Sequence, residues 1–579
     1  MHPIIAHAFS YEKHNILDFK EVIMRQSNMV KWIAAGMLMM VFFAACKSGG
    51  GNSASNPPAS GSTTVSGTAA TGKAIANTTV FLRDESGHTA TSSTDANGKY
   101  SVNMSGFSTP VLLKITTTNG DLYGIATQSG TANLHQFTDL IIRNWYTVQG
   151  FSIETEFVKA GSISVPSKAE IDTIESVVRQ MIGSWLSTMG VDPTAFSLIT
   201  TSFNADGSGF DTVLDLLKVT ISSTSISIMA TDPNTGLAAE TVAALPAGAD
   251  LSTNPLQSAI DGVNQTLTAW KNAINAKGAS TPVTDLMPFY ASNFLNDGLD
   301  ASTDIADTLS ANNFPGTISA IGVSKIVSYD GINKTITVEC EATSSNWGTG
   351  SFEESFIYDA VQTKWLFYGN QKTVYLQLRP GVQKTISTSG TTITNILSVN
   401  AENTAGAISQ IAVSGPGLLT NPTILSKSSN GSTDNFYIPN NGPLSSPVTV
   451  GSVYTFYVTR SDATVIAYAE MIKATTSETL NISGPAGHTI ADAHIGSSIS
   501  VNWTLPTSFH VNYITLVGWV NDSNGGFQQP PYINPDIAAT SGSITLPQPT
   551  NGGTVTNAGI AIFITGTKGE QSVVNYIFE

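Results

Sequence analysis

The sequence has little charge of either sign and no cluster of basic residues. Charged residues make up 12% of its 579 residues, about half of the roughly 25% that is usual in soluble proteins. The 26 lysines and arginines and the 42 aspartates and glutamates give a net charge of −16. Nucleic-acid binding depends on a positive surface that neutralises phosphates, so the composition argues against DNA and RNA as partners.

The signatures of common reactions are also absent. The sequence contains no His-Glu-x-x-His, no Gly-x-Ser-x-Gly, no phosphate-binding Gly-Lys-Ser/Thr and no Cys-x-x-Cys-His. We therefore predict a protein that is not an enzyme and that holds no cofactor, with calcium as the one alternative considered below.

Cysteine is rare, with Cys46 and Cys340 as its two occurrences. Lipidation of Cys46, argued below, would leave no pair for an intramolecular disulfide, so packing must stabilise the fold. Cys340 alternates with apolar residues on a predicted strand, and no histidine lies between His135 and His488. We expect a buried thiol at this position and not a catalytic nucleophile.

One short apolar run near the start is the strongest targeting signal. Lys31 is followed by the apolar residues 32–43 and then by Ala44-Ala45-Cys46. A helix of about twelve residues spans roughly 18 Å, too short for a hydrocarbon core of roughly 30 Å, so the run predicts a secretion signal.

The residues Phe43-Ala44-Ala45-Cys46 resemble the lipobox of bacterial lipoproteins, with Phe43 where Leu is usual. The resemblance implies cleavage before Cys46, lipid on that cysteine and, because Lys47 rather than Asp follows, an outer-membrane location facing the periplasm or the cell surface. An ordinary signal peptide with a chance cysteine is the alternative.

This interpretation makes residues 1–45 the signal peptide. Residues 1–28 do not fit such a peptide, so Met29 is a second candidate for the start. Residues 46–63 are rich in Gly, Ser, Asn and Pro and are expected to form a flexible tether to the membrane.

Turn clusters between short β runs predict an antiparallel sandwich over residues 64–128. Three segments resemble carboxypeptidase regulatory-like (transthyretin-like, Cna-B-like) domains: Val65-Ser66-Gly67, Val80-Phe81-Leu82 and Thr94-Asp95-Ala96-Asn97-Gly98-Lys99-Tyr100. The resemblance implies a structural module without catalysis.

Helical periodicity dominates residues 129–250, which we expect to be a helical segment. The clearest helix is predicted over residues 167–189, with Ser167 and Glu170 as a capping box and Gly190 as the stop. Shorter helices are predicted over residues 139–146 and 210–218.

Residues 251–380 combine helix and strand. Asn254 as N-cap, Pro255 at the first helical position and Gly278 as the stop predict a helix over residues 255–277. More helix is expected around residues 285–295. Strands are predicted at 321–329, 335–343, 352–358, 364–368 and 374–378.

This order of elements resembles the cone fold of nuclear transport factors and ketosteroid isomerases, together with the run Lys364-Trp365-Leu366-Phe367-Tyr368-Gly369. Enzymes on that fold need a base and an oxyanion partner inside the cone, and neither is assigned here. Tyr290, Tyr329, Trp365 and Tyr368 are candidates to line a pocket, although aromatic side chains at such positions are more often core.

Short alternating runs separated by Gly, Asn, Pro and Ser predict two β-sandwiches, over residues 381–478 and 479–579. Residues 500–506 resemble a fibronectin type III or immunoglobulin-like strand that carries the core Trp503. The predicted fold class is therefore multidomain and mainly β, made of β-sandwiches with a helical segment and an α+β cone-like domain.

One loop has the spacing of a calcium-binding EF-hand. Oxygen-bearing side chains stand at its positions 1, 3, 5 and 12, namely Asn204, Asp206, Ser208 and Asp215. The last position lacks the bidentate Glu, and Asp211 stands where an apolar residue normally packs. We favour a glycine-rich turn that precedes a helix, with a calcium site as the alternative.

A second candidate metal site consists of His488, Asp492 and His494, which would share one side of a strand. Gly487 and Gly496 bracket them in what the composition indicates is a loop. We therefore assign no metal there.

These features predict a membrane-anchored lipoprotein that is a non-enzymatic binding or cell-surface scaffold protein, with surface proteins or glycans as partners. The alternative is a small-ligand carrier or an enzyme that uses the cone cavity, and a hollow cone with an ionisable residue near a donor would favour it. We expect the distal residues 381–579 to make the contacts. Tyr532 is a candidate exposed anchor, with edge packing as its alternative.

The lipid anchor is testable by labelling. Replacing Cys46 with Ser should abolish incorporation of a clickable fatty acid in cells, because the acceptor thiol is lost, while Cys340→Ser should label like the wild type. Equal labelling of the Cys46→Ser protein would contradict the prediction.

Overall fold

The computed structural model describes residues 63–579 except 312, 430, 484–485 and 551. The predicted signal peptide, Met29, Cys46 and all of the tether but Thr63 lie outside the described residues. The described chain is mainly β, with several sheets and a smaller share of helix, which confirms the predicted fold class. Among the helices that the structure describes, none has the length and apolar character needed to cross a membrane.

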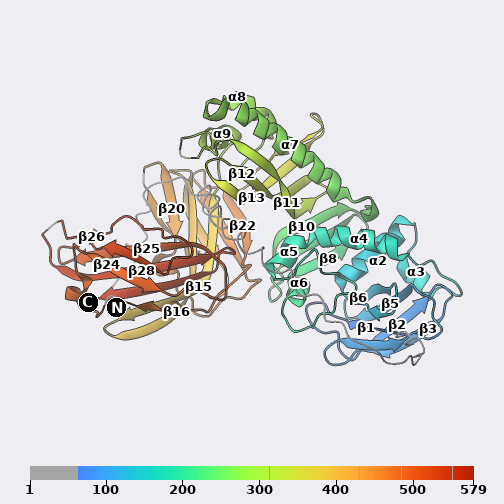
Figure 1. The fold of residues 1–579 in the computed structure, drawn as a ribbon. Coiled ribbons are helices and arrows are strands. Elements are labelled where there is room, and N and C mark those ends of the chain that lie inside the picture. The colour runs from blue at the N-terminus through green and yellow to red at the C-terminus, as the bar shows by residue number, and fades with distance from the viewer. Residues whose placement is uncertain (1–62, 312, 430, 484–485, 551) are drawn as a thin grey trace, which may run out of the picture.

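The first unit is a sandwich of two small sheets, ordered β4-β1-β7 and β3-β2-β5-β6 (Figure 1). Its strands are β1 (Thr64–Thr68), β2 (Thr79–Asp84), β3 (Thr89–Ser93), β4 (Lys99–Asn103), β5 (Val111–Thr117), β6 (Gly120–Ala126) and β7 (Gly130–Thr131). In the turn before β4, Asp95 Oδ1 accepts hydrogen bonds from the backbone N–H of Asn97 and Lys99, both at 2.8 Å. The hydroxyl of Tyr100 donates to the carbonyl of Ala132 at 2.5 Å. These residues of the motif therefore have structural roles.

Five helices follow: α2 (Gln136–Val148), α3 (Ile153–Val158), α4 (Lys168–Met181), α5 (Gly183–Thr188) and α6 (Phe210–Leu216). The capping box of Ser167 and Glu170 is present at the start of α4, as predicted. The single helix expected over residues 167–189 is interrupted at Ile182, whose φ of −101° and ψ of 8° are not helical. Gly183 follows at once, and glycine weakens a helix because its backbone is so free.

Residues 217–246 form three strands instead of the expected helical segment: β8 (Leu217–Ile221), β9 (Ser225–Thr231) and β10 (Ala238–Pro246). The end of the helix predicted over 210–218 accordingly lies in β8. Burial alternates along β9, as in a strand with one face in a core. The β-branched residues of this stretch favour strands, and β8, β9 and β10 pair with one another as antiparallel neighbours.

These strands extend a seven-stranded sheet, ordered β14-β13-β12-β11-β10-β9-β8. Its other members are β11 (Ile318–Asp330), β12 (Thr335–Ser344), β13 (Gly348–Asp359) and β14 (Lys364–Phe367). Neighbouring strands are antiparallel except β10 and β11. The sheet thus joins part of the predicted helical segment to the predicted cone-like region.

Helix α7 (Pro255–Lys277) packs on β11 and β14, and its bounds confirm the prediction. The side chain of Asn254 accepts a hydrogen bond from the backbone N–H of Gln257 at 3.2 Å, and Gly278 ends the helix with a φ of 64°. The helix expected around residues 285–295 was placed wrongly. The structure has α8 (Val283–Leu286), a 3₁₀ turn at Met287–Phe289 and α9 (Ala301–Thr308) instead.

The C-terminal part is built on an eight-stranded sheet, ordered β19-β20-β16-β15-β29-β28-β25-β26. Its strands are β15 (Tyr375–Ser387), β16 (Gly390–Thr404), β19 (Ser426–Ser429), β20 (Thr433–Tyr437), β25 (Val511–Asp522), β26 (Phe527–Gln528), β28 (Val555–Gly566) and β29 (Gln571–Phe578). β15 pairs with β16 on one side and in parallel with β29 on the other. One sheet therefore runs through both regions that the sequence suggests are separate sandwiches (orange and red in Figure 1).

Two smaller sheets, ordered β18-β17-β21-β22 and β23-β24-β27, pack on the large one. Their strands are β17 (Ile408–Ser414), β18 (Thr423–Ile424), β21 (Val453–Arg460), β22 (Val465–Met471), β23 (Ile482–Ser483), β24 (Ser498–Trp503) and β27 (Ser541–Thr545). Each small sheet forms an apolar core with the large one. Leu376 and Leu378 of β15 pack on the first core, beneath the sheet that contains β17 and β21. Ile386 packs on the second core, beneath the sheet that contains β24 and β27. Because these residues share one side of β15, both small sheets cover the same face of the large sheet. Trp503 is buried in the second core, as predicted.

The close approach of β15 and β29, which pair in parallel, gives a stability prediction. A Cβ added at Gly381 would lie 1.7 Å from the carbonyl oxygen of Gln571. Gly381→Ala should therefore lower the free energy of unfolding by about 2 kcal/mol or more, because backbone must move. Gly183→Ala is the control, since its nearest neighbouring atom would be 3.8 Å away. Equal thermal unfolding midpoints for the two variants would contradict the prediction.

Candidate functional site

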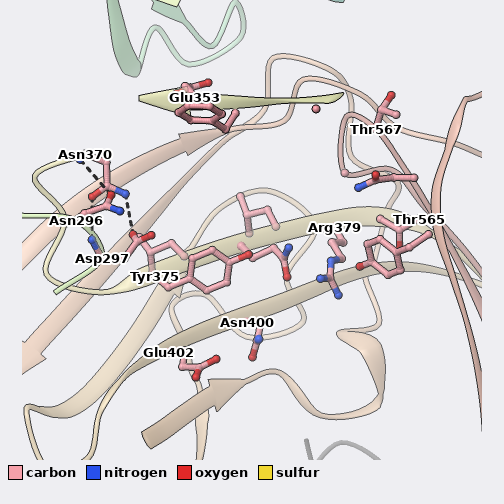
Figure 2. A pocket seen from close by; sticks show the side chains of 18 of the residues that line it. Asn296, Asp297, Glu353, Asn370, Tyr375, Arg379, Asn400, Glu402, Thr565 and Thr567 are labelled. Carbon is pink, nitrogen blue, oxygen red and sulfur yellow. Dashed lines mark hydrogen bonds between the residues drawn. The ribbon is translucent and has the colours of Figure 1, made fainter. Parts of the chain in front are cut away.

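A cavity of about 1430 Å³ is lined by the seven-stranded sheet with its helices on one side and by the eight-stranded sheet on the other (Figure 2). On the eight-stranded sheet it meets the face that the two small sheets leave open. Polar and aromatic side chains dominate that face, which we call the cavity floor: Tyr375, Gln377, Arg379, Ser398, Asn400, Glu402, Asn435, Tyr437, Tyr513, Thr515, Trp519, Phe563, Thr565, Gln571 and Asn575.

Strand alternation places these side chains together. Tyr375 pairs with Glu402 and Arg379 pairs with Ser398, in the register of β15 and β16. Successive side chains of a strand point to opposite faces, so the odd residues of β15 reach the cavity while Leu376 and Leu378 enter the core. Figure 2 shows Tyr375 and Arg379 on one strand with Glu402 on its neighbour.

One end of the floor carries a carboxyl group held by an amide. Asn370 donates from Nδ2 to Asp297 Oδ1 at 2.8 Å, and the backbone N–H of Asp297 donates to Asn370 Oδ1 at 3.1 Å. Loss of solvent around Asp297 raises the pKa of its carboxyl group to about 6, although Asn370 and the nearby Lys372 act in the opposite direction. This group therefore titrates close to neutral pH.

The opposite wall of the cavity holds a phenol and two carboxyl groups. The hydroxyl of Tyr290 donates to Asp304 Oδ2 at 3.3 Å. Burial, and then the charge of Asp304, raises the pKa of Glu354 to about 8. Glu354 therefore keeps its proton at neutral pH, where it can donate a hydrogen bond. This is the ionisable group near a donor that the carrier or enzyme alternative requires.

The cavity as a whole is acidic. Arg379 and Lys568 are the cations among its lining residues, and Lys568 donates to the carbonyl oxygen of Thr188 at the end of α5. The lining carboxylates are Asp297, Asp304, Asp307, Glu339, Glu353, Glu354 and Glu402.

Polar contacts also connect the small sheet that contains β22 with the segment before β15 and with the seven-stranded sheet. Lys372 forms an ion pair with Glu470 of β22, and the backbone N–H of Thr373 donates to the hydroxyl of Tyr468 at 3.0 Å. Lys473 Nζ lies 3.1 Å from Glu240 Oε1 of β10. These contacts tie the segment before β15, and β10 of the seven-stranded sheet, to the small sheet that contains β22 or to the residues just after it.

The aromatic candidates from the sequence separate in the structure. Tyr290 lines the cavity, whereas Tyr329, Trp365 and Tyr368 are not among its lining residues. Tyr329 and Trp365 are buried in the core instead. Cys340 is a buried free thiol, as predicted, and burial raises its pKa.

Tyr532 is not the exposed anchor that the sequence suggested. It is partly buried and packs with Trp519 and Phe563 on the cavity side of the eight-stranded sheet. Its neighbour Ile533 bridges to Leu516 of β25, which draws this loop onto the sheet.

The EF-hand-like loop makes internal hydrogen bonds. Asp206 Oδ1 accepts from the backbone N–H and the hydroxyl of Ser208, at 3.1 and 2.6 Å, and Asp211 Oδ2 accepts from the N–H of Gly207 at 2.8 Å. Asp215 lies against Gly72 of the first unit. Within residues 63–579, apart from the positions left undescribed, no three His, Cys, Asp or Glu side chains converge as a metal site would need. That calcium binds at most weakly at Asn204, Asp206, Ser208 and Asp215 stays a prediction.

The second candidate metal site consists of His488, Asp492 and His494. These residues do not share a strand face, because residues Ile490–Ala493 form a 3₁₀ turn. The ring of His488 stacks on Tyr576 with 4.3 Å between centroids. Asp492 forms a capping box with Thr489, and His494 ends the turn with a φ of 42°. The residues therefore lie in a turn, as the bracketing glycines indicated, and lack the common strand face that the metal alternative needed.

The residues of the cavity floor were missed by sequence reasoning. Tyr375-Leu376-Gln377-Leu378-Arg379 alternates polar and apolar side chains, and Ser398-Val399-Asn400-Ala401-Glu402 does the same. This alternation indicates a strand with one polar face. The alternation does not indicate which distant segments of the chain lie across the cavity from that polar face.

No protein-family model and no curated protein matches the chain. Among solved structures, a hypothetical protein from Parabacteroides merdae is 16% identical with a TM-score of 0.12, over 30% of this chain. This chain spans about half, 51%, of that protein's length. The FN1-FN3 domains of chicken CNTN1 are 10% identical with a TM-score of 0.14, over 46% of this chain and 100% of theirs. The similarity to fibronectin type III domains is thus weak and carries no functional argument.

The raised pKa of Glu354 predicts a pH-dependent stability. A carboxyl group whose pKa is higher in the folded state stabilises the fold below its unfolded pKa, and this contribution is lost as the pH rises through the folded pKa. The free energy of unfolding should therefore fall as the pH rises from about 4.5 to about 8. Glu354→Gln should reduce that fall by on the order of 2 kcal/mol, because cavity water screens part of the effect.

Thermal unfolding across this pH range measures the effect. Glu341→Gln, at an exposed position of the same sheet, should leave the pH dependence as it is in the wild type. A fall in stability of equal size in the wild type and in Glu354→Gln would contradict the prediction.

Proposed function

We propose that this protein is a non-enzymatic, membrane-anchored binding protein that takes a glycan into the cavity above the eight-stranded sheet. The observation that carries the proposal is the polar and aromatic character of the cavity floor. The opposite face of the same sheet is sealed by two apolar cores. A face left open and lined by amides, hydroxyls and aromatic rings is suited to recognition.

Glycan chemistry matches this floor. A sugar carries hydroxyl groups that both donate and accept, and side-chain amides such as Gln377 and Asn400 do the same. The C–H faces of sugars pack on aromatic rings, which Tyr375, Tyr513 and Trp519 supply. Each hydroxyl bound in this way also discriminates against ligands that lack it.

Other ligand classes fit less well. A lipid tail would leave the amide and hydroxyl groups of the floor without partners, which is costly. The excess of carboxylates around the cavity repels the phosphates of nucleic acids. Surface proteins remain a second class of partner.

The membrane anchor and the outer-membrane location are part of the proposal. They are supported by the apolar run before Cys46 and by Lys47 after it. A tether of this composition would hold the cavity in the cell envelope, where glycans are abundant.

A second candidate function is a small-ligand carrier or an enzyme, and the wall with Tyr290, Asp304 and Glu354 favours it. A protonated carboxyl group beside a phenol is able to exchange a proton with a bound ligand. Turnover of a ligand that is lost in Glu354→Gln would distinguish this function from binding alone.

Binding to a glycan array followed by calorimetry tests the main proposal. Tyr375→Ala and Asn400→Ala should each weaken binding of the captured glycan by about tenfold, because a stacking or hydrogen-bonding partner is lost. The matched control is Tyr457→Ala, since Tyr457 is 41% exposed on β21, away from the cavity. The proposal fails if no glycan binds, or if folded cavity variants bind like the control.

A further inference from the structure

The cavity floor contains one guanidinium group in an unusual setting. The guanidinium carbon of Arg379 lies 5.3 Å from the centroid of the Tyr513 ring. The two side chains come from β15 and β25, which are separated by β29 and β28 in the sheet. Between them lie Gln571 and Thr565, which the strand register places in one row with Tyr513. Arg379 and Tyr513 thus reach toward each other across the floor.

Both side chains have polar atoms without a protein partner. Arg379 Nε and Tyr513 Oη are buried and have no hydrogen-bond partner among the described residues. None of the ion pairs in the described part of the chain includes Arg379. The residue itself is partly exposed and its guanidinium pairs with no carboxylate of the described residues, so it keeps donors that a ligand in the cavity can reach.

We propose that the glycan bound in this cavity is acidic and that Arg379 binds its carboxylate, as in a uronic acid residue. The inference rests on the glycan proposal above and adds the chemical class of the ligand. Because Nε is covered, the two Nη atoms are the donors left for a ligand, and their planar fork matches the two oxygens of a carboxylate. Stacking on Tyr513 holds the plane of the guanidinium.

The acidic surroundings of the cavity do not prevent this pairing. Glu402 and Asp297 belong to the Tyr375 end of the floor, and Tyr375 is four residues from Arg379, or about 13 Å along the strand. The neutral side chain of Gln377 lies between Tyr375 and Arg379 on the same face of the strand. On the opposite wall, Glu354 is protonated at neutral pH. None of the lining carboxylates forms an ion pair with Arg379 in the described part of the chain, so the guanidinium stays available to a ligand.

The test compares two ligands of equal length, an oligogalacturonate and its carboxyl-reduced neutral form, by calorimetry with the full mature chain. The wild type should bind the acidic form at least tenfold more tightly. Arg379→Gln should remove this preference and still bind the neutral form, and Arg379→Lys should restore only part of it because the planar fork is lost. Lys384→Gln removes the same charge from β15, where Lys384 bonds to Asn481 at 3.2 Å, and should keep the preference.

The outcomes separate the two proposals. Equal affinity of the wild type for both ligands, or a preference that persists in Arg379→Gln, overturns the carboxylate inference and leaves glycan binding standing. Equal or tighter binding of a sulfated oligosaccharide of the same length also overturns it, because a planar carboxylate is then not what Arg379 selects. Absence of binding to every glycan overturns the glycan proposal and this inference together.

Discussion

The parallel pairing of β15 with β29 is the contact on which the C-terminal part of the protein, from Tyr375 onward, depends. It joins residue 381 to residue 571 and makes one sheet of eight strands from two halves that each have their own covering sheet. Gly381 permits this pairing because any side chain there would meet the backbone of the partner strand. Without it, two sandwiches with separate edges would remain, and unpaired edges are a liability for association.

The same pairing produces the cavity floor. Because both small sheets cover one face, the other face is continuous over β16, β15, β29, β28 and β25. A continuous face lets side chains from strands that are distant in sequence, such as Arg379 and Tyr513, meet above it. The seven-stranded sheet faces this floor across the cavity, and burial of Asp297 and Glu354 in the cavity lining raises the pKa of both carboxyl groups.

Local signals in the sequence predicted local structure well. The N-cap Asn254 and the stop at Gly278 placed α7 correctly, because each acts through hydrogen bonds and backbone angles within a few residues. The alternation that buries Trp503 was visible for the same reason. Strands β8 to β10, which were missed, pair with each other in sequence order, and only β10 joins them to the rest of the sheet, through β11. The cavity was missed because no local pattern states which sheets face each other.

The two faces of the eight-stranded sheet separate stability from recognition. Its covered face holds the large apolar side chains, and burial of such side chains is the dominant stabilising contribution to a fold. The open face carries polar groups whose burial contributes little stability and, for Arg379, leaves a charge without a protein partner. A chain that only needed to fold would gain nothing from such a group. A guanidinium without an ion pair on the floor of the cavity is therefore better explained by a ligand than by the architecture. This is why the floor, and not the sealed cores, carries the functional argument.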